Sequence, residues 1–115
     1  MLKKIVITGG DGRFAQVLKN NNIKLDILYP NKKKLDILDL ESITKYLKKN
    51  KPAYVIHAAA LSRPMSIHDR QISKSIDLNI IGTCNIVKVC ADLKIKLIYF
   101  STGYVYEGKK GNYKE

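Results

Sequence analysis

The sequence predicts an α/β fold, a doubly wound parallel sheet with helices on both faces. Short apolar segments alternate along the chain with segments of helical spacing. Most of the short segments are apolar throughout, which is typical of parallel strands buried on both faces. The length of 115 residues suits one domain with one core. Right-handed crossovers in such a sheet place bound ligands at the carboxyl ends of the strands.

Five segments have the composition of buried strands. They are residues 3–8 (KKIVIT), 24–29 (KLDILY), 35–38 (LDIL), 53–60 (AYVIHAAA) and 96–101 (KLIYFS). The fourth ends in small residues, and Gly9 and Pro30-Asn31 follow the first and second. We therefore expect a sheet of five parallel strands.

Helical spacing separates these strands. Residues 12–20 predict a first helix, with an apolar face of Phe14, Val17 and Leu18. A second helix is expected from Leu40, because Asp39 is a good N-cap and Pro52 follows its end. A longer helical segment covers about residues 67–92. No repeat or linker interrupts this order, so the chain is predicted to form one domain.

A glycine loop joins the first strand to the first helix. Thr8 ends the strand, and Gly9, Gly12 and Ala15 follow at a spacing of three residues. Glycines let backbone N–H groups approach a phosphate, and the helix N-terminus adds its dipole. Ala15 is small enough for the helix to pack on the strand. The loop predicts a site for a dinucleotide pyrophosphate, although a plain glycine turn has the same local pattern.

The end of the second strand bears on which dinucleotide binds. An acidic residue there would bind the ribose hydroxyls of NAD. The chain has Tyr-Pro-Asn-Lys-Lys-Lys at residues 29–34 instead, and Asp26 lies within the strand. Arg13 and one of these lysines could bind a 2′-phosphate through charge-assisted contacts. We therefore expect NADP(H) to be preferred, with NAD(H) as the alternative.

Composition limits the other functions. The net charge of +11 comes mostly from lysines, including clusters at residues 32–34 and 48–51. Such a charge attracts polyanions, but no nucleic-acid motif accompanies it, so nucleic acid is not an expected partner. No apolar run approaches the roughly 20 residues of a membrane span. The N-terminus lacks the pattern of a signal peptide, so we expect a cytoplasmic protein.

The cysteines and histidines have ordinary structural explanations. Cys84 and Cys90 lie in a helical segment without disulfide or metal-ligand spacing, so we expect reduced packing residues and no metal site. His57, near the expected cofactor, is interpreted as a packed residue at a strand end. His68 is expected to face solvent.

Five motifs in order resemble one family: TGGDGRFA, LDILD, VIHAAA, LNIIGT and YFSTGYVYEG. They are similar to the extended short-chain dehydrogenase/reductase family of nucleotide-sugar enzymes. The dTDP-4-dehydrorhamnose reductase branch is the nearest, followed by sugar-nucleotide epimerases and dehydratases. The resemblance covers nearly the whole chain and implies an NAD(P)-binding Rossmann domain.

The resemblance assigns roles to individual residues. It implies that Gly9, Gly12 and Ala15 hold the pyrophosphate, with Arg13 and Phe14 among the cofactor contacts of the same loop. It places Asp36 and Ile37 beside the adenine. It also places Ala58, Ala59 and Ala60 under the cofactor. It implies that Asn79 supports the active site, and that Ser101 and Thr102 lie at the substrate, where Thr102 polarises its carbonyl. Each of these polar residues also has a plain structural explanation, as a cap, a strand end or a satisfied helix residue.

The chain departs from the family pattern in two places. Gly103 stands where this branch usually has an acidic residue. The family's catalytic Tyr-x-x-x-Lys pair belongs on a helix after this point, whereas Tyr106 and Lys110 lie in a glycine-containing loop. We interpret their spacing as coincidence. The chain is thus expected to be the N-terminal half to two-thirds of the Rossmann domain, residues 1–115, without the substrate-binding region.

Three functions remain open from the sequence. The first is an NADP-dependent reductase, or an NAD-dependent epimerase or dehydratase, acting on a nucleotide-linked sugar. The second is a dinucleotide-binding module that forms a homo-oligomer or pairs with a complementing chain. The third is an inactive remnant. Cofactor binding would separate the third from the others, and turnover of NADPH with a keto-sugar nucleotide would separate the first from the second.

Overall fold

The computed structural model describes residues 2–21, 23–62, 64–100, 108–109 and 111. The four strands of its parallel sheet lie in the order β2-β1-β3-β4. They are β1 (Lys4–Ile7), β2 (Asp26–Leu28), β3 (Tyr54–His57) and β4 (Lys96–Tyr99). The α/β class and the parallel sheet predicted from the sequence are confirmed.

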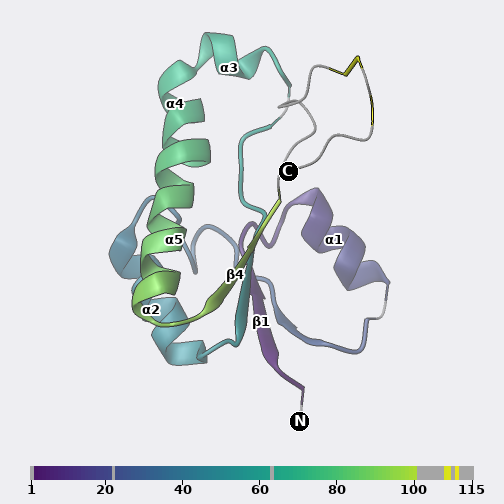
Figure 1. Ribbon diagram of the computed structural model, residues 1–115, viewed down its shortest axis with the longest axis vertical. Coiled ribbons are helices and arrows are strands. Elements are labelled where there is room, and N and C mark those ends of the chain that lie inside the picture. Colours follow the sequence, from purple (N-terminus) through teal and green to yellow (C-terminus); the bar gives the residue numbers. More distant parts are fainter. Residues whose placement is uncertain (1, 22, 63, 101–107, 110, 112–115) are drawn as a thin grey trace.

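Helices cover the sheet on both sides (Figure 1). Helix α1 (Arg13–Asn20) lies on one side, and α2 (Leu40–Asn50) and α5 (Gly82–Asp92) lie on the other. The segment before α5 contains α3 (Ile67–Arg70), α4 (Ile72–Ile76) and the π-helical turn η1 (Asp77–Ile81). This is the doubly wound arrangement. None of the helices in the described part of the chain is long and apolar enough to cross a membrane.

The second helix follows its sequence signals closely. The Asp39 carboxylate accepts hydrogen bonds from the backbone N–H groups of Glu41 and Ser42, so it caps the first turn of α2. Ile43 and Leu47 are both buried, four residues apart on one face of the helix. The helix ends at Asn50 and is followed by the C-cap Lys51, whose φ of 47° is left-handed.

The core lies between the sheet and the α2–α5 layer. Its buried members come from both strands and helices: Val6, Leu35, Ile37, Ile43, Leu47, Val55, Ile86, Val89 and Cys90. The face of α1 is different, because Ala15 is its single buried residue. Phe14 is 39% exposed and Val17 is 58% exposed, so the expected apolar face of this helix remains largely uncovered.

Two expectations about strands were wrong. Residues 35–38 form an irregular segment that ends in a turn at residues 37 and 38, rather than a third strand. The Asp36 side chain accepts a hydrogen bond from the N–H of Leu38, and the N–H of Asp36 donates to the Ser42 hydroxyl. These local bonds replace a sheet ladder while Leu35 and Ile37 still reach the core. The strand expected over residues 53–60 ends at His57, so Ala58, Ala59 and Ala60 form a loop.

Candidate functional site

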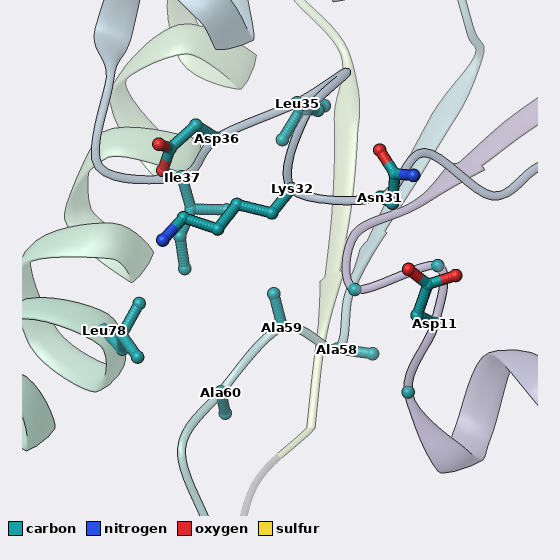
Figure 2. Close-up of a pocket in the computed structure, with 13 residues that line it drawn as sticks. Asp11, Asn31, Lys32, Leu35, Asp36, Ile37, Ala58, Ala59, Ala60 and Leu78 are labelled. Atoms are coloured by element: carbon teal, nitrogen blue, oxygen red, sulfur yellow. The ribbon is translucent and has the colours of Figure 1, made fainter.

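The cavity that holds most of the predicted cofactor residues lies where the order of strands reverses. From β1 the chain crosses to β2 on one side and then returns to β3 on the other. Ligands of doubly wound sheets bind in the crevice at such a point, beyond the carboxyl ends of the strands. A cavity of about 310 Å³ lies here (Figure 2). Its lining consists of Gly9, Gly10, Asp11, Gly12, Asn31, Lys32, Leu35, Asp36, Ile37, Ala58, Ala59, Ala60 and Leu78.

Close contacts between backbones shape the glycine loop. Gly9 has a φ of +70°, and a Cβ there would lie 3.0 Å from the Cα of Ala59. A Cβ on Gly10 would lie 2.2 Å from the carbonyl oxygen of Tyr29. The N–H of Gly10 donates to the Pro30 carbonyl over 2.9 Å. Gly10 therefore joins the loop to the end of β2. Its role was not predicted from the sequence, where the Gly9-Gly10 doublet was the available signal.

The N-terminus of α1 opens beside this loop. Gly12 is the N-cap residue, and no side chain among the described residues caps the helix through a hydrogen bond. The first intrahelical bond runs from the N–H of Gln16 to the Gly12 carbonyl. The N–H groups of Arg13, Phe14 and Ala15 therefore have no acceptor within the helix. These three residues do not line the cavity, and Ala15 is fully buried, which leaves the N–H groups of the exposed Arg13 and Phe14 as those that could bind a phosphate beside it.

A buried hydroxyl links the two strands that flank the cavity. Thr8, which is fully buried, accepts hydrogen bonds at Oγ1 from the N–H groups of Ala58 and Ala59, each over 3.0 Å. Both lone pairs of the hydroxyl are then used, so its proton is donated to Nδ1 of His57, 2.8 Å away. Thr8 thereby fixes the backbone of the alanine loop against the end of β1.

His57 extends this chain of hydrogen bonds into the helix layer. Because Nδ1 accepts from Thr8, the neutral ring carries its proton on Nε2 and donates to Thr83 Oγ1 over 3.0 Å. Thr83 in turn donates to the carbonyl of Asn79. Burial lowers the pKa of His57 to about 4, so the ring is neutral at pH 7. The interpretation of His57 as a packed residue agrees with its exposure of 2%.

Asn79 holds the loop that follows the alanines. Its Oδ1 accepts from the N–H of Leu61 over 2.7 Å, and its Nδ2 donates to the Leu61 carbonyl over 2.8 Å. The side chain is thus fully engaged with one backbone residue. Asn79 lies in η1, and π-helical turns often occur at functional sites. The geometry suits a supporting role better than direct contact with a reacting group.

The lining of the cavity includes charged side chains of both signs. Asp36 and Ile37 line it together with Lys32, whose side chain extends towards them in Figure 2. Asp11 contributes a second carboxylate. Arg13 is exposed and lies outside the lining. Of the two cations expected near a 2′-phosphate, the structure therefore places the lysine in the cavity wall.

Several predicted residues lie elsewhere. Ser101 and Thr102 fall outside the described residues, as do Gly103, Tyr106 and Lys110. Cys90 is buried, which raises the pKa of its thiol to about 11, whereas Cys84 is exposed and is not a packing residue. His68 is half-buried and shares a hydrogen bond with Ser75, so it does not simply face solvent.

Known proteins resemble this chain over much of its length. Methionine adenosyltransferase 2 subunit beta of Xenopus laevis is 33% identical over 81 residues, covering 70% of this chain and 24% of that protein. dTDP-4-dehydrorhamnose reductase of Aggregatibacter actinomycetemcomitans is 25% identical over 118 residues, covering 99% of this chain and 40% of the relative. The chain thus spans about a quarter to two-fifths of these proteins.

The crystal structure of dTDP-4-dehydrorhamnose reductase from Bacillus anthracis, in complex with NADP, superposes with a TM-score of 0.83 at 27% identity, covering 96% of this chain and 40% of that one. This agrees with the resemblance to the dTDP-4-dehydrorhamnose reductase branch. The family model described as RmlD substrate binding domain matches residues 3–115. The protein therefore belongs to the RmlD substrate binding domain family, which includes NADP-dependent reductases.

Proposed function

We propose that this chain binds NADP(H) as the cofactor-binding part of an oxidoreductase that reduces a keto group of a nucleotide-linked sugar. The observation that carries the proposal is the cavity at the reversal point of the sheet. Its lining combines the glycine loop with the alanine loop after β3. A relative supports both the cofactor and the reaction class, because the B. anthracis protein is a dTDP-4-dehydrorhamnose reductase crystallised with NADP.

The residues present fit a dinucleotide. The uncapped N–H groups of Arg13 and Phe14 would hold a phosphate at the start of the helix that Ala15 packs onto the sheet, and Gly12 adds no side chain to the space beside them. Asp36 and Ile37 would flank the adenine. Ala58, Ala59 and Ala60 would pass under the cofactor with little side-chain bulk.

The reaction needs a carbonyl held in place and a proton donor. The cofactor, when bound, would exchange a hydride with the keto carbon of the sugar. We propose that Thr102, beside Ser101, donates a hydrogen bond to the keto oxygen. Asn79 would act as a positioning residue through its two bonds to Leu61. No residue of this chain is assigned to the family's catalytic Tyr-x-x-x-Lys pair, so we expect no turnover from these 115 residues alone.

A preference for NADP(H) rests on Lys32. Its ammonium group can pair with a 2′-phosphate, whereas the carboxylates of Asp11 and Asp36 in the same lining would repel the phosphate. We expect Lys32→Ala to weaken NADPH binding by roughly tenfold and NADH binding much less. Lys34→Ala is the matched control, because Lys34 belongs to the same lysine cluster but does not line the cavity. Calorimetric titration of both cofactors measures the difference.

A second function is supported by the other relative. A family member named as a subunit of methionine adenosyltransferase shares 33% identity with this chain. We propose as the alternative that the chain is a dinucleotide-binding component, acting within a homo-oligomer or with a complementing chain.

Thermal unfolding with and without cofactor tests both functions. NADPH at 100 times its Kd should stabilise the fold by about 2.7 kcal/mol. Gly12→Val should abolish most of this shift, since it places side-chain bulk at the phosphate position; unfolding without ligand checks that this variant still folds. A shift without NADPH oxidation in the presence of a keto-sugar nucleotide is expected of the chain alone under both functions, whereas NADPH oxidation would contradict the alternative of a binding component. No shift with either cofactor would contradict both functions.

A further inference from the structure

Helix α5 lies directly behind the Ile37 wall of the cavity. Gly82, the first residue of α5, is buried against the Ile37 side chain. A Cβ at Gly82 would lie 2.5 Å from Cδ1 of Ile37 and 2.9 Å from its Cγ1. Both distances are too short for real atoms to share. Any side chain at position 82 would therefore displace Ile37, which is only 6% exposed between helix and cavity.

The same helix holds the backbone of Ile37. Asn85 donates from Nδ2 to the Ile37 carbonyl over 2.9 Å, across 48 residues of sequence. Gly82 and Asn85 are three residues apart and therefore lie close together on α5. One side of the helix thus fixes both the side chain and the carbonyl of a single cavity residue.

The contacts from α5 matter for this part of the cavity lining because residues 35–38 do not belong to the sheet. They form an irregular segment that ends in a turn and has no strand ladder. Their local bonds run to Ser42 and within the turn itself. Neither of those bonds involves the Ile37 carbonyl. Among the described residues, Asn85 of α5 is therefore the side chain that holds the Ile37 carbonyl, while the Ile37 side chain packs against Gly82 and the core.

We propose that Gly82 and Asn85 are positioning residues that set the affinity of the cavity for the adenine end of a dinucleotide. This inference rests on the proposed function, because it needs a dinucleotide in the cavity. A displaced Ile37 would enter the space that Asp36 and Ile37 line, while the glycine loop at the other side would keep its contacts. The effect should consequently fall on the adenylate half and spare the nicotinamide half.

The experiment titrates the folded chain with NADPH, ADP and nicotinamide mononucleotide. Gly82→Ala should weaken NADPH and ADP by about the same factor, on the order of tenfold, because it overpacks a buried contact. Binding of the mononucleotide should not change. Adding Ile37→Val, which removes Cδ1, the nearer of the two clashing atoms, should recover part of the lost affinity for ADP.

A second variant and a control keep the test decisive if Gly82→Ala unfolds. Asn85→Ala leaves the Ile37 carbonyl without its partner and should also weaken ADP selectively. Asn50→Ala removes a similar bond, from Nδ2 to the Tyr46 carbonyl in α2, and should leave ADP binding unchanged. An equal loss of ADP and mononucleotide affinity, or no loss in either α5 variant, would overturn the positioning role. If the unmodified chain binds neither NADPH nor NADH, the proposed function itself fails and the inference with it.

Discussion

A single buried histidine makes the stability of this protein depend on pH. Burial lowers the pKa of His57 to about 4 in the folded state, against 6.5 in the unfolded chain. The unfolded state therefore binds the proton more readily between these values. The contribution of neutral His57 is complete above pH 6.5, is lost as the pH falls towards 4, and amounts at most to about 3 kcal/mol.

Chemical denaturation at pH 7.5, 6 and 4.5 measures this dependence. His57→Gln should flatten the part of the slope between pH 6.5 and 4, because glutamine does not titrate, although it should also destabilise the fold by breaking the Thr8–His57–Thr83 chain. His68→Gln, the matched control at the other histidine, should keep the slope of the unmodified protein. If His57→Gln and the unmodified protein lose stability in parallel, His57 is not the group responsible.

At the scale of elements, side chains of η1 and α5 hold several residues in and around the cavity through hydrogen bonds. Asn79, Thr83 and Asn85 each bond to a different part of the site: Leu61, His57 and the Ile37 carbonyl. Asn79→Ala should leave both polar groups of Leu61 without their side-chain partner and destabilise the loop by about 1–3 kcal/mol. Hydrogen exchange should show faster exchange of the Leu61 amide with little change in β1. Unchanged exchange at Leu61 would mean that the loop is held by other contacts.

The elements also show where prediction from the sequence succeeds. Asp39 and the spacing of Ile43 and Leu47 predicted α2 correctly, because capping and burial there are local. Residues 35–38 were predicted as a strand because a short, mostly apolar segment has the same composition whether it pairs in a sheet or forms a turn. The difference depends on Ser42 and Asn85, whose contacts with this turn form only in the folded chain.

At the scale of the whole molecule, topology explains why much of the site was predictable. Parallel strands bring the glycine loop after β1 and the alanines after β3 to one edge, so Gly9, Gly12 and Ala58–Ala60 meet in one cavity. The contacts of Gly10, Gly82 and Asn85 were missed. Gly10 meets Tyr29, and the other two meet Ile37, so their importance depends on distances between backbones and side chains far apart in sequence.

The whole molecule also carries an uncovered apolar edge. Strand β4 pairs with β3 alone among the described strands, and its Ile98 and Tyr99 are 44% and 58% exposed. Phe100 follows and packs edge-to-face on Phe14 of α1, with ring centroids 5.0 Å apart. An unpaired apolar edge favours association through strand pairing, whereas a net charge of +11 opposes it.

Salt decides between these two effects, because it screens the charge and leaves the apolar edge unchanged. We expect sedimentation velocity to show the chain mostly monomeric at low salt and increasingly associated as salt rises towards about 1 M, where the screening length falls to about 3 Å. Ile98→Lys should suppress this association, since a charge on an edge strand disfavours pairing. Ile72→Lys adds the same charge at a residue that is 61% exposed on α4, away from the edge, and should associate like the unmodified chain. Equal suppression by both variants would mean that total charge controls association, and a chain that stays monomeric at every salt concentration would mean that the edge is not used.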